Sequence, residues 1–164
     1  AVVTVGSFAA GVRNNIVPET ATLTGTIRTF DAAVRRSIHE KIRSIAQQTA
    51  TAMGAVATVE IDPGVPVTFN DAALTKQMVP TLERVYGEGA VFESPRVTGA
   101  EDFSFYQEQV PGFFFFIGAR PPELSAAEAI PNHSPFFYVD ENALAPAVRA
   151  MTQLAIDYLN AGAR

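Results

Sequence analysis

Two stretches near the start of the chain have the hydrophobic pattern of β-strands. Residues 2–8 are rich in β-branched side chains, and the segment "GVRNN" at 11–15 that follows them has the composition of a turn. Residues 20–30 alternate between an apolar side and a threonine-rich side that ends in Arg28. This alternation predicts a second strand with one polar, accessible face.

The next segment has the period of an α-helix. Residues 31–53 carry apolar side chains at every third or fourth position, with an aspartate able to cap the helix at its start and Gly54 just past its end. Residues 55–62 return to a strand pattern that stops at a Pro-Gly pair. The order predicts a β-β-α-β block, an α+β arrangement in which the helix covers one face of a sheet.

Residues 63–71, "PGVPVTFND", mark an internal boundary. Two prolines within four residues stop regular structure, and the Asn-Asp pair at its end offers a cap for a new helix. A helical pattern then runs over residues 72–86. Pro80 lies inside this pattern and is expected to kink or restart the helix, because proline lacks the amide hydrogen that a helix interior uses.

The C-terminal half mixes short strands with helical segments. Residues 91–103 predict short strands and a Gly-Ala turn that leads into a helical turn over 102–109. "GFFFFIGA" at 112–119 is apolar on both faces, so it predicts a strand in the centre of a sheet. A loop over 119–132 precedes a final helix at 141–161, whose predicted inward positions are Leu144, Val148, Met151, Leu154, Ala155 and Leu159.

Composition narrows the class of protein. The chain has 164 residues, is 48% hydrophobic and carries a formal net charge of −5, which favours a globular protein over a disordered one. It has no basic patch and no apolar run long enough for a membrane helix, so neither nucleic acid nor a membrane is expected as a partner. The absence of cysteine excludes disulfides and zinc–thiolate sites, and favours a reducing compartment such as the cytoplasm.

His133, in the segment "IPNHSPFF", is the first candidate for chemistry. A neutral imidazole suits Zn²⁺, Mn²⁺, Co²⁺ or Ni²⁺, and loops after central strands are where sites gather in open α/β sheets. The alternative is a loop histidine satisfied by backbone carbonyls, because a metal site needs three or four ligands and no second ligand motif lies nearby. The other histidine, His39, lies on the first predicted helix and is interpreted as solvated.

The segment "GAEDF" at 99–103 is the second candidate. Gly99 and Ala100 allow the backbone to approach another group closely, and Glu101 and Asp102 begin a helical turn whose amides could bind an anion. The alternative is that Asp102 is an ordinary helix cap. The pattern alone leaves both interpretations open.

Asn15 and Arg28 form the third candidate. If the first two strands pair as a hairpin, these side chains could converge on one carboxylate, with Arg28 supplying a two-pronged donor and Asn15 a single one. The alternative is an edge-strand arginine in water. The sequence contains no Ser-His-Asp set, no P-loop and no glycine-rich dinucleotide motif.

Four segments, taken in chain order, resemble the C-terminal part of the M20 metallopeptidase/amidohydrolase family. They are "GVRNNIVPETATLTGTIRTFD", "PVTFND", "VTGAEDFSFYQEQVPGFFFFIGA" and "NHSPFFYVDENAL", and the similarity is greatest to hippurate hydrolase-like N-acyl-amino-acid amidohydrolases. The resemblance covers essentially the whole chain. It implies a mixed α+β and α/β fold in which a ferredoxin-like lid domain, which also forms the dimer interface, is inserted in an α/β exopeptidase-type catalytic domain.

The same resemblance implies domain boundaries and residue roles. Residues 1–67 would be the lid without its first strand and helix, and residues 68–164 the C-terminal segment of the catalytic domain. His133 matches a metal ligand, and the lid residues matched by Asn15 and Arg28 grip the substrate, in many members across a dimer. The substrate-facing loop of the family is matched by Gly99 and Glu101.

The implied activity belongs to a longer parent protein. That parent would be a homodimeric, metal-dependent amidohydrolase that cleaves N-acyl amino acids (hippurate-like) or small peptides with metal-activated water, using two divalent ions (Zn, Mn, Co or Ni). The family's general base and other metal ligands lie in its N-terminal part, and this chain opens inside a strand pattern. We therefore expect a piece that has no catalytic residue, binds no metal by itself and exposes apolar surface. The alternative is a non-catalytic dimerisation module.

Overall fold

The computed structural model describes residues 1–162, and its chain divides into two compact units. Unit 1 consists of residues 1–68 and a return segment, 96–105, from the C-terminal half of the chain. Unit 2 consists of residues 69–95 and the chain from residue 106 onward. The return segment therefore brings the "GAEDF" candidate into the same unit as the N-terminal strands.

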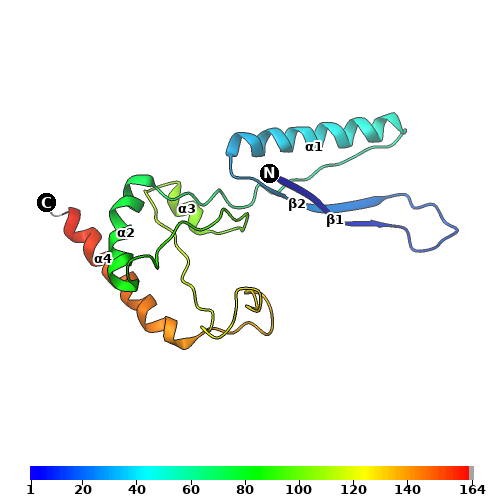
Figure 1. The fold of residues 1–164 in the computed structure, drawn as a ribbon. Coiled ribbons are helices and arrows are strands. Elements are labelled where there is room, and N and C mark those ends of the chain that lie inside the picture. Colours follow the sequence, from blue (N-terminus) through cyan, green and yellow to red (C-terminus); the bar gives the residue numbers. More distant parts are fainter. Residues whose placement is uncertain (163–164) are drawn as a thin grey trace. The chain divides into compact units, whose positions relative to one another are not determined.

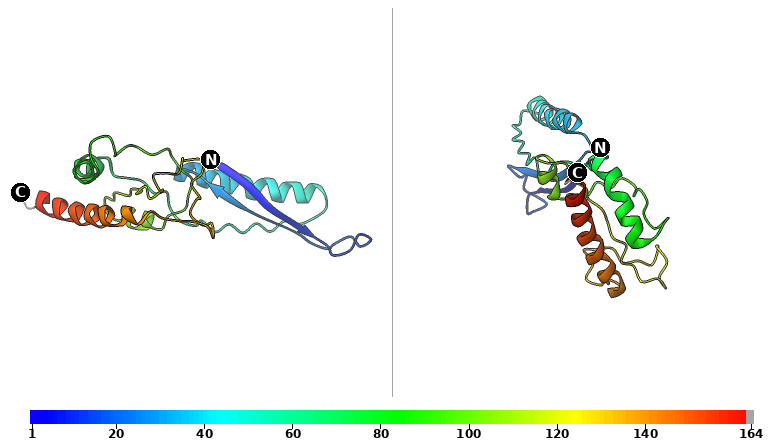
Figure 2. Two further views of the ribbon diagram at one scale, coloured as in Figure 1. Left: turned by 60° about the horizontal axis from the view of Figure 1, so that its bottom comes forward. Right: turned by 90° about the vertical axis from the view of Figure 1, so that its left-hand side faces the viewer.

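The first two predicted strands are confirmed as an antiparallel hairpin. β1 (Val2–Ala10) and β2 (Ala21–Arg28) run side by side to a connecting loop (Figures 1 and 2). Gly25 lies close to the backbone of β1, since a Cβ atom there would be 2.1 Å from the carbonyl oxygen of Thr4. The strand pairing therefore requires glycine at this position.

A β-bulge keeps the apolar side chains of the hairpin on one face. Val3 and Val5 occupy odd positions and Phe8 an even one, so an unbroken strand would place Phe8 on the opposite face. The pairing shifts between Val5 and Ser7, which inserts one extra residue into β1. As a result Phe8 pairs with Leu23 on the face that carries Val3 and Val5, and the threonines share the other face with Val2 and Arg28.

The predicted first helix is confirmed as α1 (Ala32–Ala52), with Asp31 as its N-cap: the amide of Val34 donates to the Asp31 carboxylate at 2.8 Å. Gly54 follows the helix with a φ of +72°. His39 is half-buried rather than fully exposed on this helix.

The strand predicted over residues 55–62 is absent from the described structure, so the β-β-α-β block lacks its last member. The segment instead runs back past α1 without a strand partner (Figure 1). Its end is held by Arg35, whose guanidinium donates to the carbonyls of Pro63 and Val65 at 3.2 and 3.1 Å. An alternating sequence becomes a strand only when another backbone pairs with it, and the only strand pairing described in residues 1–162 is β1 with β2.

Unit 2 is built on two helices. α2 (Ala72–Tyr86) begins at Asp71, whose carboxylate accepts the amide of Leu74 at 2.8 Å, and it continues through Pro80 without restarting. α4 (Leu144–Gly162) follows the short 3₁₀ helix η1 (Glu141–Ala143), and α3 (Phe103–Gln107) confirms the predicted helical turn. No helix within residues 1–162 is long and apolar enough to cross a membrane.

The core of unit 2 lies between α2 and α4 and is small. Its buried apolar residues are Met78, Leu82, Ala150 and Leu154. The inward face predicted for the last helix was therefore largely wrong, because α4 packs on α2 through a stripe that contains only one of the predicted residues. The predicted positions that are exposed instead are Leu144, Val148, Met151, Ala155 and Leu159.

The "GFFFFIGA" segment is an extended chain rather than the predicted central strand. A side chain replaces the missing strand partner: the Asn70 amide donates to the carbonyl of Phe114 and its oxygen accepts the Phe114 amide, both at 2.7 Å. Phe113 and Phe115 stack with ring centroids 5.5 Å apart and pack against the core. The side chains of this segment thus alternate as in a strand, and one of its faces packs on the helices. No second strand pairs with its backbone in the described structure.

Candidate functional site

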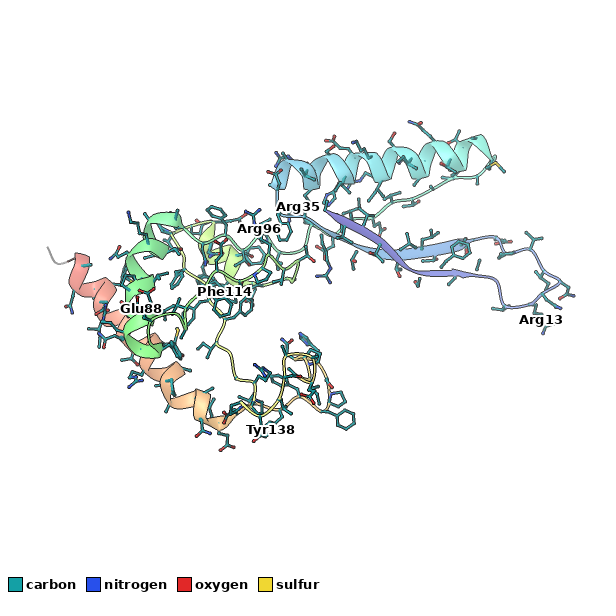
Figure 3. The ribbon with its side chains drawn as sticks, in the orientation of Figure 1. Arg13, Arg35, Glu88, Arg96, Phe114 and Tyr138 are labelled. Atoms are coloured by element: carbon teal, nitrogen blue, oxygen red, sulfur yellow. The ribbon has the colours of Figure 1, made fainter. Side chains whose placement is uncertain are left out.

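Arg28 and Asn15 lie at opposite ends of the hairpin. In the pairing register Arg28 faces Val2, whereas the last pair before the connecting loop is Ala10 with Ala21. Seven residues of strand separate Arg28 from that last pair, or about 23 Å, and Asn15 lies beyond it in the loop, whose neighbouring residue Arg13 marks the tip in Figure 3. The suggested convergence within one chain was therefore wrong, because an antiparallel hairpin places its turn far from its open end.

Arg28 contacts the return segment instead. Its guanidinium donates a hydrogen bond to the backbone carbonyl of Thr98, which directly precedes Gly99. Arg28 is the last residue of β2 and lies on the threonine-rich face, as the alternation predicted. The structure thus joins two of the three predicted candidates, which are separated by about 70 residues in sequence, within unit 1.

Glu101 is turned toward its own backbone. Its carboxylate accepts the amide of Phe103 at 3.4 Å, and its carbonyl accepts the hydroxyl of the fully buried Ser104 at 2.7 Å. Glu101, rather than Asp102, therefore takes the capping position before α3. That carboxylate already accepts one of the amides that the sequence offered as an anion site, and Gly99 and Ala100 remain as an exposed stretch beside it.

His133 has an unusual backbone. It is the single non-glycine residue with a positive φ among residues 1–162, at +72°. It lies in a turn closed by the Ser134 amide, which donates to the carbonyl of Pro131 at 3.3 Å. Residues other than glycine are rare in this region because their Cβ crowds the backbone, and such outliers often mark functional positions. The imidazole is exposed.

The described residues do not build a metal centre by themselves. Within residues 1–162 no three histidine, cysteine, aspartate or glutamate side chains lie close enough together to hold one ion. His133 fits a metal as a single exposed nitrogen donor, whereas a zinc site in a protein has three or four ligands. A dinuclear centre thus requires donors beyond those that this chain brings together.

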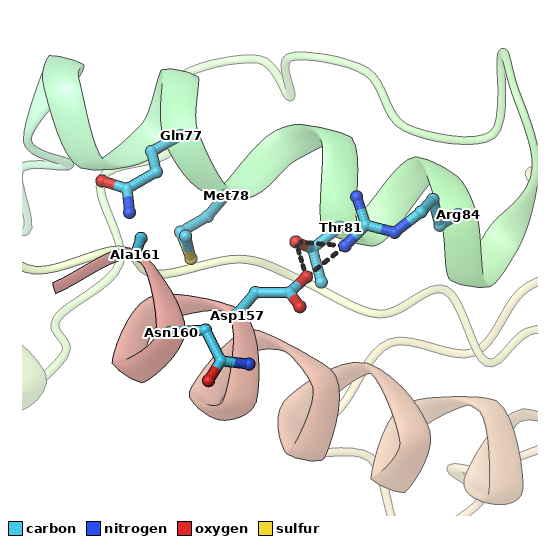
Figure 4. Close-up of a pocket in the computed structure, with 7 residues that line it drawn as sticks. All are labelled: Gln77, Met78, Thr81, Arg84, Asp157, Asn160 and Ala161. Atoms are coloured by element: carbon cyan, nitrogen blue, oxygen red, sulfur yellow. Dashed lines mark hydrogen bonds and ion pairs between the residues drawn. The ribbon is translucent and has the colours of Figure 1, made fainter. Parts of the chain in front are cut away.

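A pocket of about 500 Å³ lies between α2 and α4, and three of its polar residues, Thr81, Arg84 and Asp157, bond to one another (Figure 4). The buried hydroxyl of Thr81 donates to the Asp157 carboxylate at 2.5 Å, and Arg84 forms an ion pair with the same oxygen. The hydrogen bond from Thr81, with a second from Gln153, holds the pKa of Asp157 below its ordinary value. These contacts join two helices, and the pocket contains none of the predicted site residues.

The sequence as a whole matches the family described as Peptidase family M20/M25/M40 over residues 3–157. The chain belongs to this family. A solved Bacillus subtilis structure, described as a dinuclear metal-binding peptidase from the M20 family, superposes with a TM-score of 0.77 at 30% identity, covering 97% of this chain and 42% of that one. The mixed α/β fold with its small two-stranded sheet is thus a part of the M20 fold.

Curated relatives are hydrolases of amides and peptides. The chain is 33% identical over 160 residues to thermostable carboxypeptidase 2 of Saccharolobus solfataricus, and 33% identical over 157 residues to N-acetylcysteine deacetylase of Bacillus subtilis. These matches cover 97% and 95% of this chain but 39% of each relative. A plant relative, IAA-amino acid hydrolase ILR1-like 6 of Arabidopsis thaliana, is 33% identical and is covered to 35%. The chain therefore spans less than half the length of these relatives.

Sequence reasoning did not anticipate the residues that hold the return segment. Thr98 contributes a backbone carbonyl, which no side-chain pattern reveals, and Ser104 is an unremarkable serine between two phenylalanines. Asn70 was read only as part of a helix start, although it holds Phe114 as well. A buried hydroxyl or amide that satisfies backbone groups far away in sequence leaves no local signature.

Proposed function

We propose that this chain is part of a metal-dependent M20 amidohydrolase that cleaves the amide bond of N-acyl amino acids or of small peptides. The family membership and the amide- and peptide-hydrolysing relatives support this class of reaction. In this proposal residues 1–67 belong to a lid domain and residues 68–164 to the catalytic domain. A divalent metal bound in the parent protein would activate water and polarise the scissile carbonyl. We further propose that the chain alone is inactive, with the general base and the other metal ligands supplied by the rest of the parent protein.

The positive φ of His133 is the observation that carries the proposal. A histidine held in the left-handed region costs about 1–2 kcal/mol, and a glycine would remove that cost. The imidazole is exposed and the turn needs only its backbone. A metal-ligand role for its nitrogen supplies a reason for histidine where packing supplies none.

Asn15, Arg28, Gly99 and Glu101 are proposed to contact substrate. Arg28 and Asn15 lie too far apart along the hairpin to grip one small molecule from the same chain. If both grip the same substrate, Asn15 comes from a second subunit. This separation supports the proposed homodimer, in which each lid loop reaches the site of its partner.

The exposed apolar surface is a further support. The total accessible surface of the chain, polar and apolar together, is 13030 Å². Two separate compact proteins of half its mass would together have a total of about 9,500 Å². α4 has a second apolar stripe, opposite the one that packs on α2, and a helix that is apolar on two sides is normally covered on both. We propose that the remainder of the M20 catalytic domain covers this surface.

The test uses the parent protein and this chain side by side. The parent should bind about two divalent ions per subunit and hydrolyse an N-acyl amino acid such as hippurate, and its His133→Ala variant should lose metal and turnover together. The isolated 164-residue chain should show neither. Stoichiometric metal and full turnover in the variant would refute the assignment of His133, and hydrolysis by the isolated chain would refute its predicted inactivity.

A second candidate is a non-catalytic dimerisation module. The hairpin favours it, because both strands have an unpaired edge and one face is exposed and apolar. Light scattering on the isolated chain separates its two predictions: a dimer without activity agrees with this candidate, and a monomer contradicts it.

A further inference from the structure

The stretch Thr98–Glu101 is held at both ends and free in the middle. At its first residue the carbonyl of Thr98 accepts a hydrogen bond from Arg28, and at its last residue the carbonyl of Glu101 accepts the hydroxyl of buried Ser104. Gly99 and Ala100, between these two anchors, are exposed. A short loop fixed in this way keeps its backbone in one place while its middle stays accessible.

The two anchors differ in kind. Ser104 is fully buried at the start of α3, so its bond to Glu101 is built into the fold. Arg28 projects from the exposed end of β2, and its guanidinium carries five N–H donors, of which the Thr98 contact uses one. A charged donor to a carbonyl is among the stronger hydrogen bonds, and the remaining donors can bind an anion without releasing it.

We propose that Arg28 is a positioning residue that fixes the backbone of the loop 98–101 against substrate, in addition to any contact that it makes with the substrate carboxylate. The proposal deepens, and rests on, the proposed amidohydrolase function. It assigns Arg28 a role in the ligand-free protein, where the hydrogen bond to Thr98 is already present. Loss of Arg28 therefore disorders Gly99 and Ala100 before any substrate arrives.

The first experiment measures this order directly. Backbone ¹⁵N relaxation of the 164-residue chain should give order parameters near 0.85 for Gly99 and Ala100, and Arg28→Ala should lower them below about 0.6. Arg28→Lys should restore most of the order, because an ammonium can still donate to one carbonyl. Arg35→Ala is the matched control: Arg35 also donates to carbonyls, but to those of Pro63 and Val65, so it should loosen residues 63–65 and leave 98–101 unchanged.

The second experiment separates positioning from carboxylate binding. The parent enzyme is assayed with an N-acyl amino acid and with the same compound whose carboxylate is converted to a neutral amide. If Arg28 positions the loop, Arg28→Ala lowers kcat/KM by about 10- to 100-fold for both compounds, the equivalent of one hydrogen bond from a charged donor. If Arg28 serves only to grip the carboxylate, the loss is confined to the charged substrate.

Support for the proposal requires raised mobility at 98–101 together with a loss on both substrates. Unchanged order parameters in Arg28→Ala, or a loss on the charged substrate alone, would overturn it while leaving the amidohydrolase function intact. If the wild-type parent hydrolyses neither compound, the proposed function fails. The relaxation measurements then decide the structural claim on their own, because they need no substrate.

Discussion

Replacing His133 by glycine is expected to preserve or raise stability while it abolishes function. The residue has a φ of +72°, a conformation that costs an L-amino acid about 1–2 kcal/mol and costs glycine nothing. Against this gain stands the greater backbone freedom of glycine in the unfolded chain, worth about 0.5–1 kcal/mol. The net change is therefore about 0 to 1.5 kcal/mol in favour of the folded state, since the exposed imidazole contributes little packing.

The assay compares wild type, His133→Gly and His133→Ala by urea unfolding and, in the parent protein, by metal content. Alanine keeps the Cβ and therefore the strain, so its unfolding midpoint should match that of wild type and lie below that of the glycine variant. With a urea m-value of about 1–3 kcal/mol/M, a difference of 1 kcal/mol shifts this midpoint by about 0.3–1 M. Both variants should lose bound metal equally, because both lack the imidazole.

Two results would refute this reasoning. If His133→Gly is less stable than wild type by more than about 1 kcal/mol, contacts of the imidazole stabilise the loop, and the cost of the left-handed backbone does not dominate. If the glycine variant is stable and retains all its metal, the strained backbone has another cause and His133 is not a ligand. A variant that is stable and metal-free agrees with both parts of the argument.

Three further substitutions test the fold that positions the site. Gly25→Ala should unpair the hairpin, measured as loss of strand signal by circular dichroism, because its Cβ would lie 2.1 Å from a backbone carbonyl. Asn70→Ala removes two hydrogen bonds to the "GFFFFIGA" backbone and should lower the free energy of unfolding by about 1–3 kcal/mol in urea. Thr81→Val keeps the shape of a buried residue but removes its bond to Asp157, and should raise the pKa of that carboxyl as measured by NMR titration. Because the pKa of Asp157 is lowered on folding, its contribution to stability is complete above the unfolded value of about 3.9 and is lost as the pH falls through the folded value.

Each of these has a control in the chain. Gly6→Ala places a Cβ at an ordinary 3.9 Å from its nearest neighbour, so an effect as large as that of Gly25→Ala would contradict the steric argument. Asn70→Asp keeps an acceptor for the Phe114 amide but sets an oxygen against the Phe114 carbonyl in place of the donor, so a stability equal to wild type would contradict the role of that donor. Thr81→Ser keeps the hydroxyl, and a pKa of Asp157 that rises in Ser and Val alike would show that the hydrogen bond is not the cause.

The elements that the sequence predicted well are those whose signal is local. The alternation of 20–30 and the period of 31–53 were both confirmed, because a strand face and a helix face each leave a repeat that needs no knowledge of the partner. The caps at Asp31 and Asp71 were predicted for the same reason, since a cap bonds to an amide three residues away. The four motifs further determined the family.

The wrong predictions of strands and of the buried helix face depended on what packs against each element. Residues 55–62, 91–103 and 112–119 were predicted to form strands, but none of them has a strand partner in the described structure. Likewise, α4 buries Ala150 and Leu154 rather than the larger residues of its other stripe. The period of apolar residues shows that one face of a helix or strand is apolar. When two faces are apolar, as in α4, the period does not show which of them packs against another element. That choice is made by contacts between segments distant in sequence.

The candidate site also has features that local sequence patterns predicted and features that only tertiary contacts determined. The sequence by itself determined that Arg28 ends a polar strand face, because this follows from the alternation of neighbouring residues. The turn predicted at Gly99 and Ala100 is absent from the described structure. Only the tertiary structure decided that Arg28 binds the carbonyl of Thr98, that Asn15 lies at the far end of the hairpin, and that His133 has a left-handed backbone. The physical reason is that register and backbone conformation are set by the whole of the packed chain, whereas periodicity is set by a few adjacent residues.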